Sequence, residues 1–219
     1  MTLQIVTVPC LSDNYAYLAH DPETGATAAI DVPEAGPLLS ALDKQGWTLS
    51  DVLITHHHGD HVDGLPELLA EAPARVIGAA ADAHRLPALD VALQTGDTVR
   101  IGDEEGKVID VSGHTVGHVA FHFPESLVAF TADSLMALGC GRVFEGTMAQ
   151  MHASLGRLAA LPPDTIICSG HEYTEKNAKF ALTVDPDNPK LKSRVSEVES
   201  RRRAGKSTVP STLPTTTRS

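Results

Sequence analysis

Short apolar runs, separated by polar and glycine-containing stretches, dominate the first 170 residues of the chain. Each run is four to seven residues long, which is typical of buried strands, since helices need longer stretches. Valine, isoleucine and threonine are frequent in these runs, as they are in strands. The runs predict strands over residues 3–8, 26–32, 52–55, 75–78, 107–111, 119–123, 127–131 and 165–168.

Helical spacing of apolar positions occurs between these runs and after them. It predicts a helix that begins near Leu38 and ends at Gly46, and a second helix over residues 64–70. Asn188 and Pro189 are typical of the N-cap and the first residue of a later helix. Strands mixed with helices are therefore followed by helices alone, which indicates an α/β fold with a helical C-terminal part.

A further helix is predicted to begin after Thr147, because a threonine hydroxyl can cap the first free backbone amides of a helix. Met148, Met151, Leu155 and Leu158 follow at helical spacing and share one face. We expect this face to lie in the hydrophobic core rather than to form a binding surface.

The composition is that of an ordinary globular protein and excludes a disordered or fibrous chain. The 219 residues are 42% hydrophobic and 21% charged. No apolar run approaches the roughly 18 residues of a membrane span, so no membrane partner is predicted. The N-terminus lacks the pattern of a secretory signal, and three cysteines give no disulfide framework. These features predict a cytoplasmic protein, which we expect to be a monomer.

The formal net charge of −11 is unevenly distributed along the chain. Residues 190–219 hold eight basic and two acidic side chains, and the preceding residues hold nine basic and 26 acidic ones. Such an acidic body argues against nucleic acid as a partner, since phosphate contacts require a basic surface. The basic segment is interpreted as the solvated face of a helix.

Four possible metal ligands follow the predicted strand 52–55 within six residues. His56 and His58 are two residues apart, so in an extended segment they point to one side, and His57 points to the other. Asp60 and His61 come directly after Gly59, where the chain can turn. One tetrahedral zinc rarely takes four ligands from a single segment, so the pattern favours two adjacent metal ions over a solvated histidine-rich loop.

Three more possible ligands each follow another predicted strand. His114, Asp133 and His171 come two or three residues after strands that end near residues 111, 131 and 168. Strand ends at one edge of a sheet can converge on one place. We therefore predict one metal held by His56, His58 and His114, a second held by Asp60, His61 and His171, and Asp133 as a bridging ligand.

The segment Thr55–His61 matches the signature of the metallo-β-lactamase superfamily. Four further segments (12–15, 139–147, 170–174 and 208–213) resemble glyoxalase II, the hydroxyacylglutathione hydrolase family. The resemblance implies an αββα sandwich with the metal site at one edge of the two sheets. It also implies a catalytic domain over residues 1–170 and a helical substrate-binding domain over residues 171–219, with a shortened tail.

The family reaction implies hydrolysis of S-D-lactoylglutathione to D-lactate and glutathione, a step of methylglyoxal detoxification. A metal-bridging hydroxide would attack the thioester carbonyl, and Asp60 would hold a metal and orient this hydroxide. The thiolate leaves without a general acid, so Cys140 and Cys168 are predicted to be buried side chains rather than nucleophiles. The resemblance favours two zinc ions, although family members also accept iron or manganese.

The partner that the resemblance implies is a small molecule, a glutathione thioester. The resemblance places Arg142 near a carboxylate of its glutathione part, and it places Tyr173 and Phe144 near the rest of the glutathione. Phe144 stands where a tyrosine is common in the family. The family continues beyond residue 213 into a tail with basic residues that hold glutathione, whereas this chain retains only Arg218 there. The strength of glutathione binding is therefore left open, and a thioesterase for a non-glutathione substrate is an alternative.

Other functions are compatible with the same scaffold. Persulfide dioxygenases use one iron at the His56, His58 and His114 type of site, but the complete second ligand set favours a hydrolase. A non-catalytic metal-binding protein is disfavoured by seven intact ligands. A β-lactam hydrolase has only the metal signature in its favour.

Overall fold

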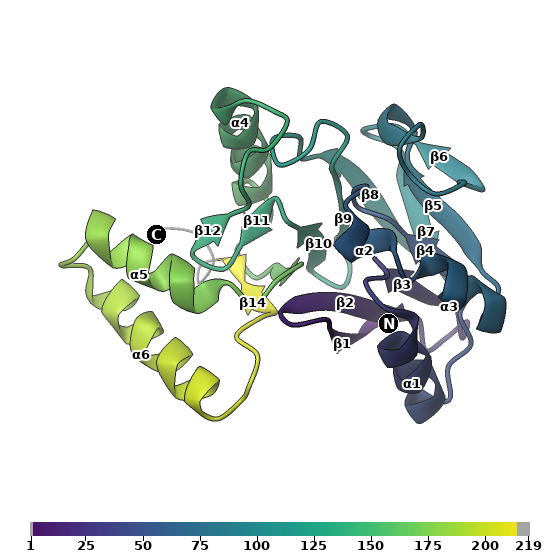
Figure 1. Ribbon diagram of the computed structural model, residues 1–219, viewed down its shortest axis with the longest axis horizontal. Helices are drawn as coiled ribbons and strands as arrows, with labels where there is room; N and C mark the ends of the chain where they lie inside the picture. Colours follow the sequence, from purple (N-terminus) through teal and green to yellow (C-terminus); the bar gives the residue numbers. More distant parts are fainter. Residues whose placement is uncertain (1, 214–219) are drawn as a thin grey trace.

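The computed structural model describes residues 2–213, which form two stacked β-sheets with helices outside them (Figure 1). The predicted αββα sandwich is confirmed. The first six-stranded sheet contains, in spatial order, β1 (Gln4–Cys10), β2 (Asn14–His20), β3 (Thr27–Ile30), β4 (Asp51–Leu53), β5 (Arg75–Ala79) and β6 (Val91–Leu93). The second contains β14 (Ser211–Thr212), β13 (Ile166–Ser169), β10 (Val128–Ala132), β9 (Val119–Phe123), β8 (Glu104–Asp110) and β7 (Thr98–Ile101).

The remaining elements are helices and one short ribbon. The ribbon pairs β11 (Leu135–Met136) with β12 (Gly139–Cys140). The helices are α1 (Ala35–Gln45), α2 (Gly59–Val62), α3 (Leu65–Glu71), the 3-10 helix η1 (Ala80–Asp82), α4 (Met148–Ala159), α5 (Thr174–Val184) and α6 (Pro189–Arg203). None of the helices within residues 2–213 is both long enough and apolar enough to cross a bilayer.

Alternation of side chains along the strands produces the layers. On β4, Leu53 faces a cluster between the two sheets that includes Phe121 and Phe130. Its neighbour Val52 faces the opposite side and packs in the cluster that contains Leu38 of α1. Strands that are buried on both faces in this way explain the continuous apolar runs of the sequence.

Strand direction determines where the candidate residues meet. Strands β3, β4, β5 and β6 are parallel, and so are β10 and β13. Strand β8 is antiparallel to β9, and β9 is antiparallel to β10, so β8 runs in the same direction as β10 and β13. Their C-terminal ends therefore lie at one edge of the second sheet.

The two helices near the C-terminus pack against each other at one end of the sandwich (Figure 1). Asn188 caps α6 through its side-chain oxygen, which accepts hydrogen bonds from the amides of Lys190 and Leu191, as predicted. The chain then returns to the second sheet, where Ser211 pairs with Ile167 of β13. Arg218 lies outside the described residues.

Several strands differ from the prediction. No strand was predicted over β2, β6, β7, β11, β12 or β14. Strand β2 is almost entirely buried, so it has no polar alternation, and it begins with a polar asparagine. Strands β6 and β7 lie at the edges of their sheets and mix exposed with buried positions. Their pairing with distant strands, rather than a local pattern, defines them.

The helix after Thr147 begins as predicted, and the apolar stripe on it is partly wrong. Thr147 and Gln150 form a reciprocal capping box. Met151 and Leu158 are buried, but Met148 is 76% exposed. The cluster that α4 covers is contacted by Leu155 and Leu158 in the later turns of the helix, and Met148 of the first turn is not part of it.

Candidate metal centre

The segment after β4 presents its histidines to two sides, as the sequence predicts. The rings of His56 and His58 lie 4.8 Å apart, and both are near His114, at 5.1 and 4.8 Å. His57 points away, with its Nδ1 atom 2.9 Å from a carboxylate oxygen of Asp82. Extended backbone at His58 produces this alternation, and α2 begins at the following Gly59.

Two clusters of possible ligand atoms lie at this edge of the sandwich. One contains His56, His58 and His114, and the other contains Asp60, His61 and His171; within each cluster the atoms lie within 4.8 Å of one another. These are the two triads that the sequence predicts, brought together from both sheets. A third cluster combines Asp31 with His56 and His61.

The Asp133 carboxylate lies between the two triads. Its oxygens are 3.5 Å from Nε2 of His61, 3.4 Å from Nε2 of His114 and 3.2 Å from Nε2 of His171. Asp133 follows β10, and the side chain is only 8% exposed. Gly170 permits this approach, because a Cβ atom there would lie 2.4 Å from Oδ1 of Asp133.

Three buried polar atoms that face this centre have no hydrogen-bond partner among the described residues: Nε2 of His56, Nε2 of His61 and Oδ1 of Asp133. Buried polar atoms are nearly always satisfied, so such atoms require an explanation. Imidazole nitrogens and a carboxylate oxygen are also the donor set that suits zinc and other first-row metals. The residues present therefore fit a metal centre.

Outer partners orient these imidazoles. Nδ1 of His61 lies 2.8 Å from Asp31, Nδ1 of His114 lies 2.7 Å from the carbonyl oxygen of Arg142, and Nδ1 of His171 lies 3.2 Å from Asp13. An imidazole that donates from Nδ1 keeps Nε2 available as an acceptor, which is the usual arrangement around metal ligands. Asp31 also accepts hydrogen bonds from the amide and hydroxyl of Thr55. Because its oxygens are engaged in this way, Asp31 is an outer partner.

The pKa values of the side chains in the centre are shifted by burial and by the neighbouring carboxylates and imidazoles. Burial opposes ionisation of Asp133, but His61 and His171 outweigh it and hold the pKa of the carboxyl at about 2. Burial also opposes protonation of His171, but hydrogen bonds to Asp133 and Asp60 raise its pKa to about 10. Burial and neighbouring imidazoles keep the pKa of His56 well below its usual value.

The three predicted substrate contacts surround these clusters. Arg142 is exposed and follows β12. Phe144 is 62% exposed, and its ring lies 5.3 Å from that of His114. The Tyr173 ring stacks on that of His171 at 4.8 Å, and Nζ of Lys176 lies 5.3 Å from the Tyr173 ring centroid.

The prediction for the cysteines is half confirmed. Cys168 is 1% exposed, and burial raises the pKa of its thiol. Cys140 is exposed, so the prediction that it is buried is wrong. It lies on the two-residue strand β12, which pairs with β11 in a ribbon outside the main sheets.

Some residues that support the centre were missed by sequence reasoning. The Asn14 amide donates to the carbonyl oxygen and to the carboxylate of Asp60, at 3.0 and 3.1 Å. Asp31 directly follows β3, and a polar residue just after a strand is the signal that identified Asp133. That signal could have found Asp31 as well, whereas Asn14 was noted only as part of the segment 12–15 that resembles glyoxalase II, with no role assigned to it.

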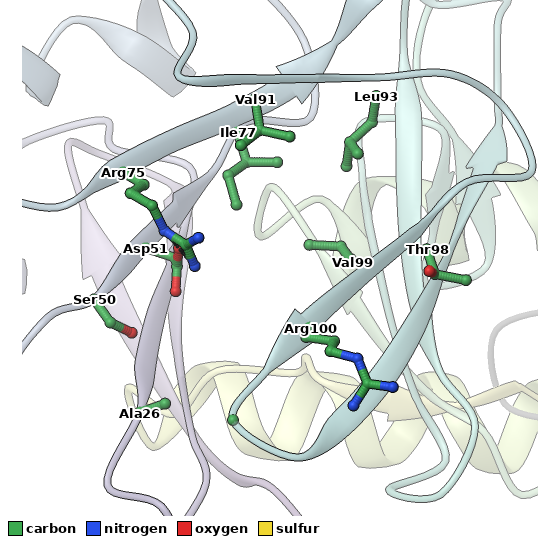
Figure 2. Close-up of a pocket in the computed structure, with 11 residues that line it drawn as sticks. Ala26, Ser50, Asp51, Arg75, Ile77, Val91, Leu93, Thr98, Val99 and Arg100 are labelled. Atoms are coloured by element: carbon green, nitrogen blue, oxygen red, sulfur yellow. Dashed lines mark hydrogen bonds and ion pairs between the residues drawn. The ribbon is translucent and has the colours of Figure 1, made fainter.

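A cavity of about 550 Å³ lies away from the metal centre, where strands β4 and β5 begin (Figure 2). Ile77, Val91 and Leu93 form an apolar wall, and Arg75 lies over Asp51. The Arg75 guanidinium is 2.7 Å from this carboxylate, so its charge is already paired. The cavity contains none of the predicted site residues.

Comparison with known proteins identifies the family. Residues 21–171 match the metallo-beta-lactamase superfamily, and residues 172–217 match the hydroxyacylglutathione hydrolase C-terminus. The chain is 67% identical to a hydroxyacylglutathione hydrolase of Jannaschia sp. over 96% of this chain and 82% of the relative. The chain belongs to the hydroxyacylglutathione hydrolase family. A second member, from Ruegeria pomeroyi, is 62% identical over 97% of this chain and 84% of its own length.

Solved structures support the same fold for this hydroxyacylglutathione hydrolase family member. The di-iron-bound form of TTHA1623 is 28% identical, with a TM-score of 0.66 over 77% of this chain and 91% of that one. ETHE1 from Myxococcus xanthus is 26% identical, with a TM-score of 0.68 over 94% of this chain and 99% of that one. The BLEG-1 B3 metallo-beta-lactamase is 21% identical over 77% of this chain and 91% of its own, with a TM-score of 0.71, and shows the fold alone.

Proposed function

We propose that the protein hydrolyses hydroxyacylglutathione thioesters, with S-D-lactoylglutathione as substrate and D-lactate and glutathione as products. The observation that carries the proposal is the pair of His/Asp triads joined by Asp133, because this arrangement suits a two-metal hydrolase. Relatives at 62–67% identity that are named hydroxyacylglutathione hydrolase support the substrate class.

In this proposal, His56, His58 and His114 would hold one divalent ion, Asp60, His61 and His171 would hold the other, and Asp133 would be a ligand shared by the two sets. When bound, such ions lower the pKa of water towards about 7 and polarise a carbonyl oxygen. Zinc is our first choice, with iron or manganese as alternatives, because imidazole and carboxylate ligands suit all three. The di-iron form of TTHA1623 supports room for two ions in this fold.

The other residues bind and orient the substrate. The Asp60 carboxylate, fixed by the Asn14 amide at 3.1 Å, orients the attacking oxygen nucleophile. Arg142 pairs with a carboxylate of glutathione, while Tyr173 and Phe144 contact the peptide. A thiolate is a stable leaving group, so the chain needs no proton donor for it. Asp133 is held ionised by its low pKa, so it would be available as a ligand throughout the neutral range.

We also propose different roles for the two parts of the chain. Residues 1–170 would supply the catalytic centre apart from the ligand His171, and residues 171–219 would form the helical substrate-binding domain. Partners other than the thioester are not required. We propose that the protein is cytoplasmic, in line with three cysteines that are free in the structure. We also propose that it is a monomer.

Steady-state hydrolysis of S-D-lactoylglutathione, with metal content measured on the same sample, tests the proposal. We expect turnover together with about two metal ions per chain. Two ions without turnover would indicate that the substrate is not this glutathione thioester, and other thioesters would be tested next. Oxygen uptake with glutathione persulfide by a one-iron sample would instead support the dioxygenase alternative.

A further inference from the structure

A ring of four charged or ionisable side chains lies beside the metal centre and belongs to no predicted site. The Asp82 carboxylate lies 2.9 Å from Nδ1 of His57 and 2.5 Å from Nε of Arg85. The Arg85 guanidinium contacts both oxygens of Glu145, at 2.5 and 3.1 Å. Nε2 of His57 lies 3.4 Å from Glu145, which closes the ring.

The ring joins three segments that are far apart in sequence. His57 comes from the ligand segment after β4, Asp82 ends η1, and Arg85 lies in the following turn. Glu145 belongs to residues 141–146, between β12 and α4, and also accepts a hydrogen bond from the Val116 amide at 3.0 Å. The Asp82 side chain is 1% exposed, so the ring is built into the molecule at that point.

Outside this ring, the backbone of residues 141–146 is held by the Arg142 carbonyl oxygen, which lies 2.7 Å from Nδ1 of His114, and by longer amide hydrogen bonds. The amides of Phe144, Glu145 and Gly146 donate to carbonyl oxygens of residues 113 and 114 at 3.2 to 3.4 Å, longer than the usual distance of about 2.9–3.0 Å. The bidentate Arg85–Glu145 contact is shorter than these amide hydrogen bonds and charge-assisted, so it is a stronger anchor of residues 144–146 than they are. This segment also carries the two proposed substrate contacts, Arg142 and Phe144.

We propose that Arg85 and Glu145 are positioning residues, which hold residues 141–146 against the ligand segment and thereby set the placement of Arg142 and Phe144 for the substrate. Neither residue contacts the candidate ligand atoms of the metal centre. The inference rests on the proposed function, because Arg142 and Phe144 are substrate contacts only if the substrate is a glutathione thioester.

Two conservative variants test the inference in the metal-loaded full chain. Arg85→Lys keeps the positive charge but loses the planar fork, and Glu145→Gln keeps the shape but loses the charge. For each we expect the KM for S-D-lactoylglutathione to rise about tenfold, with kcat within about twofold and metal content unchanged. The double variant should raise KM no further than the worse single variant, because either change opens the same ring.

Arg100→Lys is the matched control. Arg100 pairs with Glu105 at 2.9 Å on the β7–β8 hairpin, which is not part of residues 141–146. The KM of the Arg100→Lys variant should therefore equal that of the wild type. Unchanged KM values for Arg85→Lys and Glu145→Gln would overturn the inference, and so would a loss of bound metal in either variant. A lower melting temperature with an unchanged KM would show a merely structural role and would also overturn it.

Hydrogen exchange separates this inference from the proposed function, because it needs no substrate. In both ring variants, the amides of Phe144 and Glu145 should exchange at least about fivefold faster than in the wild type, while amides of β9 stay unchanged. If the wild type does not hydrolyse the thioester, the proposed function fails. Faster exchange would then still support the positioning of this segment, and unchanged exchange would overturn it.

Discussion

The Asp133 carboxylate contacts imidazoles from three segments of the chain. No other carboxylate among residues 2–213 contacts imidazoles from so many segments. Its low pKa is produced by these imidazoles in spite of burial. At the scale of the residue, the environment therefore determines the chemistry: Asp133 is an ionised acceptor between two sets of nitrogen atoms, whereas an exposed aspartate would interact mainly with water.

Replacing Asp133 tests its proposed bridging role. Asp133→Ala should reduce the metal content from about two ions to one or fewer and lower kcat by about 100-fold or more, because both ions would lose a shared ligand. Metal analysis and steady-state kinetics on one sample measure both effects. Asp164→Ala, at an exposed loop position, is the control. Full activity with two ions in Asp133→Ala would contradict the assignment.

Arg142 gives a second prediction at this scale. Arg142→Ala should raise the KM for the glutathione thioester about tenfold and change kcat by less than about twofold, since a contact made equally in ground and transition states affects binding alone. Kinetics over a range of substrate concentrations measure this. An unchanged KM would remove Arg142 from the substrate site.

The elements are connected by polar side chains at their turns as well as by apolar packing. Asp21, between β2 and β3, accepts hydrogen bonds from the Thr24 hydroxyl and from the Asp103 amide, both at 2.9 Å. Asp103 lies in the turn between β7 and β8, so this carboxylate ties a turn of one sheet to a turn of the other. Gly102 allows the approach, since its φ is +58° and a Cβ atom there would lie 2.0 Å from Asp21.

This contact predicts a pH dependence of stability. The Asp103 amide lowers the pKa of Asp21 from its usual 3.8, so the contribution is present above pH 3.8 and is lost as the pH falls through the lower folded value. At pH 7, Asp21→Asn should lower the free energy of unfolding by about 1–2 kcal/mol. Urea titrations at several pH values should show this difference shrinking below pH 4. A difference that grows in acid would contradict the assignment.

At the scale of the whole molecule, a buried carboxylate joins the two C-terminal helices to the sandwich. Glu172 accepts hydrogen bonds from the Tyr15 hydroxyl at 2.9 Å and from the Thr208 amide at 2.7 Å, and it lies 3.5 Å from the Arg202 guanidinium. These partners belong to β2, to the segment before β14 and to α6. Glu172 directly follows His171, so the same residue pair serves the centre and the attachment of the helices.

Glu172→Gln should therefore loosen this attachment. We expect the free energy of unfolding to fall by about 1–3 kcal/mol, because a buried acceptor of several donors loses its charge. Cleavage by a protease within residues 174–207 should become faster. Glu175→Gln, in the first turn of α5, is the control, since Glu175 pairs with Lys179 at the surface. Equal protease resistance of both variants would contradict the role of Glu172.

Much of the fold and of the centre is encoded in short stretches of sequence. The apolar runs predicted eight strands, and the spacing from His56 to His61 predicted which side chains share a side, because both depend only on local backbone geometry. Caps at Thr147 and Asn188 were predicted for the same reason. A polar residue just after a strand was enough to select His114, Asp133 and His171.

Only the tertiary structure decided which distant segments meet. Pairing of β14 with β13, the support of Asp60 by Asn14 and the ring around Arg85 all join residues that are tens of positions apart. Exposure of Met148 and Cys140 was likewise decided by what packs beside them. Local sequence determines φ, ψ and the direction of side chains, whereas strand order and packing determine which of those side chains come into contact.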